Sequence, residues 1–228
     1  MEKIALFYHV YQTKNWETLV QEQLETIKLS DLWQKAAYKH AGINGSKPFL
    51  YDFNSIVYNE YQESEIDTLL SLYKFCLEFP KYKVLYLHTK GVSIPPSPRA
   101  TNAHLWRKYL EYFNIQHWRK CIKYLDEYDC VGTEWQLVTG LTRPKPVPPH
   151  YSGNFWWANA EYINTLDIDF LKDTKDQTPP LTLRHQCEFW IGSKSPNFFN
   201  FNSSNKNKYS NPIYKEEYEF DSTNSHRG

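Results

Sequence analysis

Residues 84–93 read Val-Leu-Tyr-Leu-His-Thr-Lys-Gly-Val-Ser, and this stretch decides the fold. The first four residues are apolar and β-prone, and the run stops abruptly at His88, Thr89, Lys90 and Gly91. Such a run predicts a buried strand that carries polar groups at its carboxyl end. Ligands of open α/β sheets bind outside the carboxyl ends of the strands, so a site is expected here. The alternative is an ordinary strand end with a solvated lysine and a turn glycine.

Outward from this stretch, predicted strands alternate with predicted helices. β-Prone runs predict strands at residues 3–10, 49–53, 83–87, 128–132 and 150–158. Apolar residues at helical spacing predict helices at residues 16–36 with a break near Ser30, 64–79 with Ser64 as the cap, 102–113, 117–125, 159–166 and 183–191. This alternation predicts one α/β domain with a mostly parallel central sheet flanked by helices.

The remaining segments are predicted to be loops or a tail. Residues 94–100 hold three prolines, residues 143–149 are rich in proline, and residues 167–182 show no periodicity, so all three are expected to be loops. Asparagine, serine and charged residues dominate from Ser195 onward. The expected domain therefore covers residues 1–195, and residues 196–228 form a polar surface or disordered tail, part of which could dock through Phe198, Phe199 and Phe201.

Composition excludes some classes of partner. The 26 basic and 26 acidic residues cancel, so no charge footprint for nucleic acid is present. The 8 Trp, 18 Tyr and 13 Phe indicate either a thick aromatic core or sugar-stacking surfaces. The 4 cysteines show no Cys-x-x-Cys pair and are expected to be reduced core residues. No signal peptide or transmembrane segment is visible, which predicts a cytoplasmic location and leaves peripheral membrane attachment open.

Five motifs, taken in order, resemble a known family. They are Tyr-Leu-His-Thr-Lys-Gly-Val-Ser at 86–93, Trp106-Arg107, Tyr-Asp-Cys-Val-Gly at 128–132, His-Tyr-Ser-Gly-Asn-Phe-Trp-Trp-Ala at 150–158 and Cys-Glu-Phe-Trp-Ile at 187–191. Over about residues 3–192 the chain resembles nucleotide-sugar glycosyltransferases of the GT-A type. It is similar to small polysaccharide enzymes with a His-Thr-Lys motif, such as rhamnan-synthesis transferases, and to glycosyltransferases of large DNA viruses.

The resemblance implies a Rossmann-like GT-A domain that moves a hexosyl or deoxyhexosyl group. The donor would be a nucleotide-diphosphate sugar of the UDP, GDP or TDP type, and the acceptor a glycan hydroxyl in surface polysaccharide or glycoprotein glycan synthesis. Most GT-A enzymes hold a divalent metal with Asp-x-Asp, where this chain has His88, Thr89 and Lys90. Lysine is no ligand for a hard metal ion, so cationic side chains are expected to replace the metal. No cofactor is firmly indicated, and Mn or Mg stays open because Asp52, Asp129 or Glu134 could approach.

Donor-side roles follow from the resemblance. Lys90 and His88 would neutralise the leaving diphosphate, with Thr89, Gly91 and Arg107 in support. Tyr8, His9 and Val10, at the end of the first strand, would contact the nucleotide base. The structural alternative for the first group is a set of capping or surface contacts. For the second group it is a place in the core.

Acceptor-side roles fall on later residues. The donor sugar and acceptor would lie beside His150, Gly153, Asn154, Trp156, Trp157 and Glu134, although strand alternation lets only one of the two adjacent tryptophans face them. Glu188 is the preferred general base, with Glu134 and Asp129 as runners-up, and one base predicts inversion at the anomeric carbon. Phe189 and Trp190 would desolvate Glu188 and raise its pKa. The alternative for Glu188 is a helical pair with Arg184.

Two rival functions remain. The aromatic residues would suffice for a carbohydrate-binding module, although Lys90 and His88 at a strand end would then have no role. A glycoside hydrolase needs two carboxylates that flank one bond, and the sequence shows no such motif. The phosphate-binding Gly-x-Gly-x-x-Gly and Gly-x-x-x-x-Gly-Lys loops are also missing, which excludes the common dinucleotide and P-loop enzymes.

Overall fold

The computed structural model describes residues 2–60, 64–137, 147–171, 183–204 and 206–219. A seven-stranded sheet runs through it in the order β3-β2-β1-β4-β8-β5-β9. Its strands are β1 (Lys3–Tyr11), β2 (Ala36–Asn44), β3 (Ser55–Tyr58), β4 (Tyr82–His88), β5 (Cys130–Gly132), β8 (Trp156–Asn159) and β9 (Phe198–Asn200). Only β8 runs against the others among these strands. The expectation of an α/β domain with a mostly parallel sheet is confirmed, and the fold is compatible with the Rossmann-like class.

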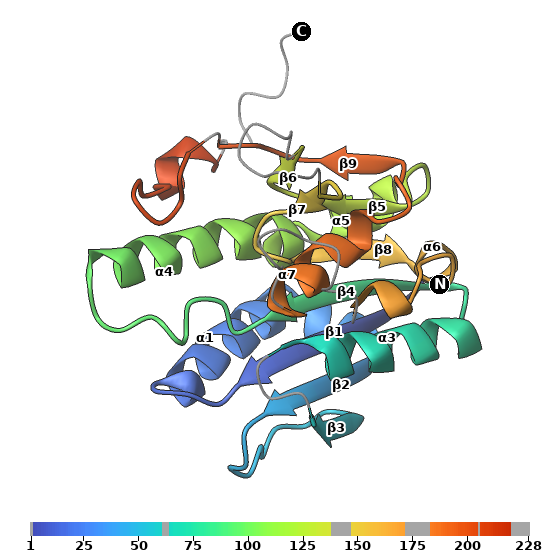
Figure 1. Ribbon diagram of the computed structural model, residues 1–228, viewed down its shortest axis with the longest axis horizontal. Helices are drawn as coiled ribbons and strands as arrows, with labels where there is room; N and C mark the ends of the chain where they lie inside the picture. The colour runs from blue at the N-terminus through green and yellow to red at the C-terminus, as the bar shows by residue number, and fades with distance from the viewer. Residues whose placement is uncertain (1, 61–63, 138–146, 172–182, 205, 220–228) are drawn as a thin grey trace, which may run out of the picture.

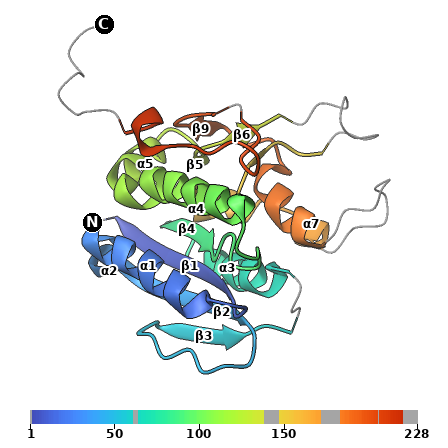
Figure 2. The same cartoon turned by 90° about the vertical axis from the view of Figure 1, so that its left-hand side faces the viewer.

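Helices cover both faces of this sheet (Figures 1 and 2). The α-helices are α1 (Trp16–Leu29), α2 (Leu32–Lys35), α3 (Ile66–Glu78), α4 (Pro98–Glu111), α5 (Trp118–Tyr124), α6 (Ala160–Ile163) and α7 (Leu183–Phe189). A π-helix (Tyr112–Gln116) joins α4 to α5, three 3-10 turns lie at Asp169–Leu171, Trp190–Gly192 and Lys215–Glu217, and β6 (Trp135–Gln136) pairs with β7 (His150–Tyr151) in a small antiparallel sheet.

Strand β1 shows how the two faces form. Leu6 and Tyr8 pack into one buried cluster with α1, α4 and α5, whereas Ala5 and Phe7 pack into another with α3, α6 and α7. Successive side chains of a strand point to opposite faces, so a continuous apolar run is what a strand buried on both sides requires. The strands expected at 3–10 and 83–87 are confirmed, and the break near Ser30 separates α1 from α2.

The predicted strand at residues 49–53 is wrong. The second strand is instead β2, at residues 36–44, which begins at the last residue of the helix predicted at 16–36. β2 pairs in parallel with β1 on one side and β3 on the other, and its last five residues are buried. Pairing with two neighbours, rather than local propensity, makes this segment a strand. Phe49 instead contributes a loop side chain that packs on Trp16, with ring centroids 6.2 Å apart.

Two helix starts also differ from expectation. The residue before α3 is Glu65 rather than Ser64, and its side chain does not cap the helix. Helix α4 begins at Pro98, inside the expected loop at 94–100, because the Ser97 hydroxyl accepts a hydrogen bond from the Ala100 N–H at 3.2 Å. Proline suits the first helical position, where no partner for an N–H is needed. Residues 143–146 of the loop predicted at 143–149, and residues 172–182 of the loop predicted at 167–182, lie outside the described residues.

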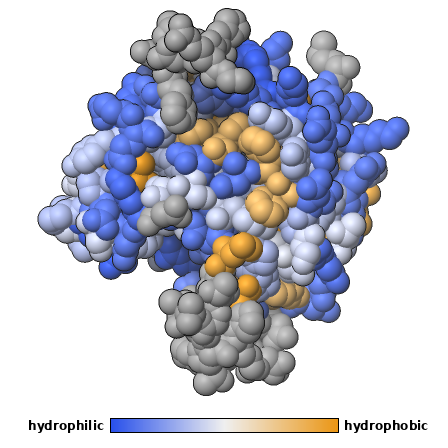
Figure 3. All heavy atoms as spheres, turned by 90° about the horizontal axis from the view of Figure 1, so that it is seen from above, coloured by the Kyte–Doolittle hydropathy of each residue, from blue (hydrophilic) through white to orange (hydrophobic). Residues whose placement is uncertain are grey.

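The expectation of a surface tail from residue 196 is wrong for its described part. Strand β9 adds to the edge of the sheet beside β5, and Phe199 stacks on Tyr124 with ring centroids 3.8 Å apart. Ile213 and Tyr218 are buried in the main cluster. The surface seen from above the view of Figure 1 is mainly hydrophilic with smaller apolar areas (Figure 3). The expected docking of part of the tail through its phenylalanines is confirmed for Phe199 and Phe201, which pack against the main cluster.

All four cysteines are buried and free, as expected for reduced core residues. Within the described ranges, the longest apolar helices fall short of what a membrane crossing requires.

Candidate functional site

A pocket of about 280 Å³ opens at the carboxyl ends of the central strands. The chain passes from β1 to β2 and β3 on one side and returns to β4 on the other, so the strand order reverses between β1 and β4. Such a switch point is where open α/β sheets bind ligands. These strand ends lie between α1 and α4 on one side and α3 and α7 on the other (Figure 2). We call this the switch-point pocket.

Several elements contribute its lining. The pocket is lined by His9, Tyr11, Asn44, Ser64, Glu65, His88, Thr89, Gly91, Val92, Ser93 and Arg184. His9, His88, Thr89 and Gly91 were expected at the site, and the structure brings them together. Asn44, from the end of β2, and Arg184, from α7, join them. The strand end at residues 88–91 therefore does form one wall of a pocket, as the opening apolar run indicated.

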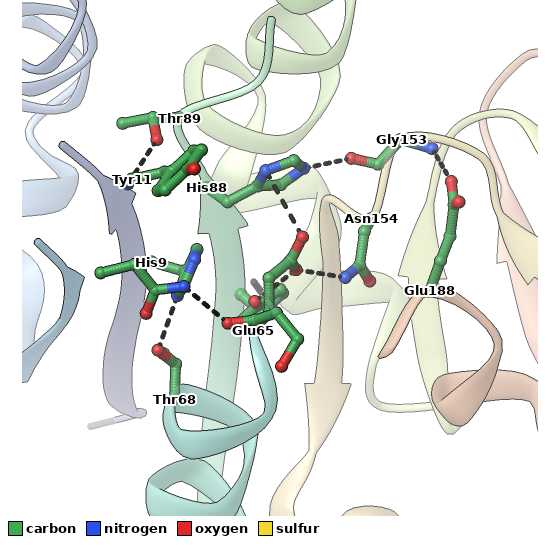
Figure 4. A network of polar contacts seen from close by, with 12 residues as sticks. His9, Tyr11, Glu65, Thr68, His88, Thr89, Gly153, Asn154 and Glu188 are labelled. Atoms are coloured by element: carbon green, nitrogen blue, oxygen red, sulfur yellow. Dashed lines mark hydrogen bonds and ion pairs between the residues drawn. The ribbon is translucent and has the colours of Figure 1, made fainter. Parts of the chain in front are cut away.

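Two neutral histidines lie side by side in this pocket (Figure 4). Burial and the nearby charge of Lys90 lower the pKa of His88 to about 3, and burial lowers the pKa of His9 to about 4. His88 Nε2 lies 2.9 Å from the Gly153 carbonyl oxygen, which can only accept, so Nε2 carries the proton. His9 Nδ1 contacts the Thr68 hydroxyl at 2.9 Å. Neither ring supplies a positive charge at neutral pH.

Glu65 is a site residue that sequence reasoning missed. Its Oε2 accepts hydrogen bonds from the Tyr86 hydroxyl at 2.6 Å and the Asn154 amide at 2.7 Å. Its Oε1 lies 3.7 Å from His88 Nδ1 (Figure 4). Because His88 is neutral at pH 7, this contact is no ion pair. The only signal in the sequence was an acidic residue at the start of a helix, which usually indicates nothing more than a favourable dipole interaction.

The turn at Gly153 and Asn154 connects His88 to Glu188. Gly153 accepts from His88 through its carbonyl and donates its N–H to Glu188 Oε1 at 2.7 Å. Its φ of +101° favours glycine, and a Cβ there would lie 2.7 Å from Leu110 Cδ1. Side chains of the protein, rather than another backbone or a ligand, therefore lie closest to this glycine.

Glu188 is held by the chain as an ionised carboxylate. Burial alone would raise its pKa, but the charges of Lys90 and His150 and the bond from Gly153 hold the pKa of Glu188 below its usual value. The predicted rise in pKa is therefore wrong. Phe189 and Trp190 do not set the pKa of Glu188, because their rings are packed into separate clusters of the core. The alternative of a helical pair with Arg184 is not what holds this carboxylate, because Glu188 Oε1 accepts from the Gly153 N–H.

Lys90 lies on the other side of the loop that follows β4. It lines a second pocket of about 430 Å³ between α1 and α4, which we call the helix pocket, together with Gly91, Val92, His104 and Arg107. Its Nζ lies 3.6 Å from the centre of the Trp106 ring, and burial lowers the pKa of Lys90 to about 8. Gly91 and Val92 line both pockets, so Lys90 belongs to the wall between them.

Arg107 faces the helix pocket and is already neutralised. Its guanidinium donates to Glu111 Oε1 at 3.0 Å and to Glu22 Oε2 at 2.6 Å. Burial by itself would lower the pKa of Arg107, but the two carboxylates raise it. We therefore assign Arg107 to the support of α4 and α1 rather than to a ligand.

Tyr8 and Val10 lie in the core and not at the pocket. The Tyr8 hydroxyl donates to Gln23 Oε1 at 2.7 Å, beneath α1, and Val10 packs in the same cluster. Of the three residues expected to contact the nucleotide base, the two-residue alternation of β1 therefore turns only His9 toward the pocket.

The two adjacent tryptophans are also core residues. Trp157 donates its indole N–H to the Asn114 carbonyl at 2.8 Å, on the α4 face of the sheet. Trp156 stacks on Tyr86 and donates to Asn154 Oδ1 at 2.7 Å. Both are fully buried, so neither presents a ring face to a sugar. Trp156 acts on the site only by orienting Asn154.

The two runners-up for the base lie elsewhere. Glu134 is fully buried, and its carboxylate contacts Lys208 Nζ at 2.5 Å and the Ser204 N–H at 2.6 Å. Asp129 precedes β5, at the amino end of a strand parallel to β4 and so away from the carboxyl ends where the pocket lies, and accepts from the Asn197 N–H at 2.8 Å. Both carboxylates hold the carboxyl-terminal segment. His150, on β7, packs on Phe189 with ring centroids 4.5 Å apart and acts on Glu188 through its charge.

No group of three or more His, Cys, Asp or Glu side chains in the described ranges is arranged to hold a metal ion.

The comparison with protein families gave one match. Residues 7–178 match the model of a family described as a domain of unknown function, DUF8361. No curated protein matches the chain. The matched range includes both histidines, Glu65, Lys90 and the turn at Gly153, and it ends before Arg184 and Glu188.

Proposed function

Because the chain belongs to the DUF8361 domain family, whose description names no activity, we propose its function from the site: it is a nucleotide-sugar glycosyltransferase of GT-A type. The observation that carries this proposal is the polar pocket at the switch point between β1 and β4. Parallel strand ends with buried hydrogen-bonding groups and a nearby arginine suit a nucleotide. The reaction moves a sugar from a nucleotide diphosphate to a glycan hydroxyl.

Within this proposal the donor occupies the switch-point pocket. His9 and Asn44, at the ends of β1 and β2, contact the nucleoside. Arg184 meets the diphosphate, since a guanidinium offers two parallel donors to phosphate oxygens. Lys90 acts from the wall between the two pockets as a second cation. Thr89 has a structural part, because its hydroxyl accepts from the Tyr11 N–H at 2.9 Å and so joins β4 to β1.

Transfer requires a base for the acceptor hydroxyl, and Glu188 takes that role in the proposal. It is ionised and bonded to Gly153, which in turn bonds His88 of the pocket lining (Figure 4). A single base supports direct displacement with inversion at the anomeric carbon. The transferred sugar and acceptor lie near Gly153, Asn154 and His150.

The binding-module alternative loses support from the aromatic residues. Seven of the eight tryptophans are buried in the core, and only Trp33 is partly exposed. A sugar-stacking surface needs exposed ring faces. The hydrolase alternative gains one observation, since Glu65 and Glu188 bond to the adjacent residues Asn154 and Gly153. Two carboxylates near one bond are what hydrolysis needs, but a hydrolase has no reason to bind a nucleotide.

Nucleotide binding is the first test. We expect UDP or GDP at about one hundred times its dissociation constant to stabilise the folded chain by roughly 2.7 kcal/mol. Thermal unfolding is followed with UDP, GDP, TDP and CMP, each with EDTA and with Mn. An unchanged shift in EDTA supports cationic side chains in place of a metal. A shift with free oligosaccharide and with none of the nucleotides would overturn the proposal.

Lys90 gives the second test. Lys90→Met keeps an apolar stem against Trp106 and removes the charge, so we expect transfer to fall roughly ten- to a hundred-fold, the value of a charge-assisted hydrogen bond. With the pKa at about 8, the native activity should also fall as the pH rises above 8, where Lys90 loses its proton. Lys123→Met, an exposed change on α5, is the control. Parental activity in Lys90→Met would remove Lys90 from the mechanism.

A further inference from the structure

Two hydrogen-bond acceptors face one another in the switch-point pocket without a donor between them. Glu65 Oε1 and His88 Nδ1 are 3.7 Å apart, which is too long for a hydrogen bond. The proton of His88 is on Nε2, where it bonds the Gly153 carbonyl, so Nδ1 presents a lone pair. Both donors that reach Glu65 go to Oε2, and none from the described residues goes to Oε1.

The two acceptors are built into the protein. Glu65 and His88 are 6% and 7% exposed and both line the pocket. Tyr86 and Asn154 fix the Glu65 carboxylate, and Gly153 fixes the His88 ring (Figure 4). Both residues line the pocket, so a ligand that occupies it can bring two donors to this point.

The chemistry of the pair selects the kind of ligand. A single hydroxyl has one proton and satisfies only one acceptor. Adjacent hydroxyl oxygens on a sugar ring are separated by about the length of one hydrogen bond, so each can donate to one of the two acceptors. A phosphate offers no donor in its ionised form and would be repelled by Glu65.

We propose that Glu65 and His88 form a subsite that accepts two hydrogen bonds from a vicinal diol of the ligand. This inference rests on the proposed function, in which the diol belongs to the ribose of the nucleotide or to the transferred sugar. A ribose source makes the enzyme prefer ribonucleotide donors such as UDP or GDP over 2′-deoxy donors such as TDP.

The test uses the full chain and a substitution that keeps the local packing. In Glu65→Gln, the amide oxygen can still accept from Tyr86 and Asn154, while the amide NH₂ takes the place of Oε1 and faces His88 Nδ1. One of the two acceptors becomes a donor, which can no longer accept a hydrogen bond from a diol, and no buried bond is broken. Glu78→Gln makes the same change at the exposed far end of α3 and serves as the control, and thermal unfolding verifies that both variants fold.

Calorimetry measures the dissociation constants of UDP, GDP and their 2′-deoxy counterparts. We expect the native chain and Glu78→Gln to bind the better ribonucleotide about ten- to a hundred-fold more tightly than its deoxy form. In Glu65→Gln this ratio should fall close to one. The ribo and deoxy forms could instead bind the native chain equally. In that case the native chain should bind UDP-glucose or GDP-mannose more tightly than the free nucleotide, and Glu65→Gln should abolish this preference. Such a result assigns the diol to the transferred sugar.

Two other results would overturn the inference. Nucleotide binding with no ribose preference and no effect of Glu65→Gln on nucleotide or nucleotide-sugar affinity would mean that the acceptors hold only water. That result would leave the proposed function standing. Failure of every nucleotide and nucleotide sugar to bind would remove both the function and the subsite.

Discussion

A chain that ends at Ser195 should not fold to a stable domain, even though the sequence places the end of the domain there. Several described residues beyond it are part of the core. Ile213 and Tyr218 are 2% and 5% exposed, and burial of such side chains contributes about 1.5–3 kcal/mol each. Their loss would also leave Glu134 unpaired, because Lys208 is its cationic partner.

The unpaired charge adds an effect of similar size. Glu134 is fully buried, and removing one partner of a buried ion pair costs about 3–5 kcal/mol. Together with the lost apolar burial, this matches the whole stability of an ordinary domain, about 5–15 kcal/mol. Circular dichroism and urea unfolding compare the shortened chain with the full one.

A matched control separates a general effect of the tail from the loss of core residues. Lys215→Ala breaks only an exposed pair with Glu219, at 3.0 Å, and should change the free energy of unfolding by less than about 1 kcal/mol. A cooperative unfolding transition in the shortened chain, with the native midpoint, would show that residues 196–219 are dispensable for the fold.

The central part of the fold could be predicted because each element there is specified locally. β1 and β4 are continuous apolar runs, as strands buried on both faces must be, and α1 and α3 have apolar residues at helical spacing. The position of the pocket followed from one rule about strand ends. The carboxyl end could not be predicted in this way, because its residues are mostly polar and β9 is only three residues long. The pairing of β9 with β5 is not visible in local sequence.

The candidate site was predicted only in part, for a related reason. His9, His88, Thr89 and Gly91 follow strands and could be placed by chain order. Glu65 could not, because its role depends on Tyr86 and Asn154, which come from other strands and their turns. Arg107, Glu134 and Trp157 have residue types typical of a site, but each of them is bonded to a partner distant in sequence.

The Glu188→Gln variant should lose at least a hundred-fold in turnover, and up to about ten-thousand-fold, since that is the usual range for general-base catalysis. Glutamine keeps an oxygen that can accept from the Gly153 N–H, so the turn beside His88 should stay in place. Nucleotide affinity should therefore change little, and the loss should appear in kcat rather than in KM.

The pH profile gives an independent measurement of the same role. The charge of Lys90 and the bond from Gly153 hold the pKa of Glu188 low, so the base form persists throughout the neutral range. Activity should fall only when the pH drops below the ordinary glutamate range, about 4.3, and Glu188→Gln should lack this acid limb. A depressed pKa also makes a weaker base, which favours the lower part of the predicted rate loss.

Comparison with other carboxylates decides whether Glu188 itself is the base. Asp129→Asn changes a residue at the amino end of β5, away from the strand ends that form the pocket, and should keep native turnover. Glu134→Gln weakens the contact with Lys208 and should lower the free energy of unfolding while kcat of the folded fraction is retained. If Glu188→Gln turns over normally and Glu65→Gln does not, the base is Glu65. Proton NMR of the first product formed gives its anomeric configuration, and retention of the donor's configuration would exclude the single displacement that one base implies.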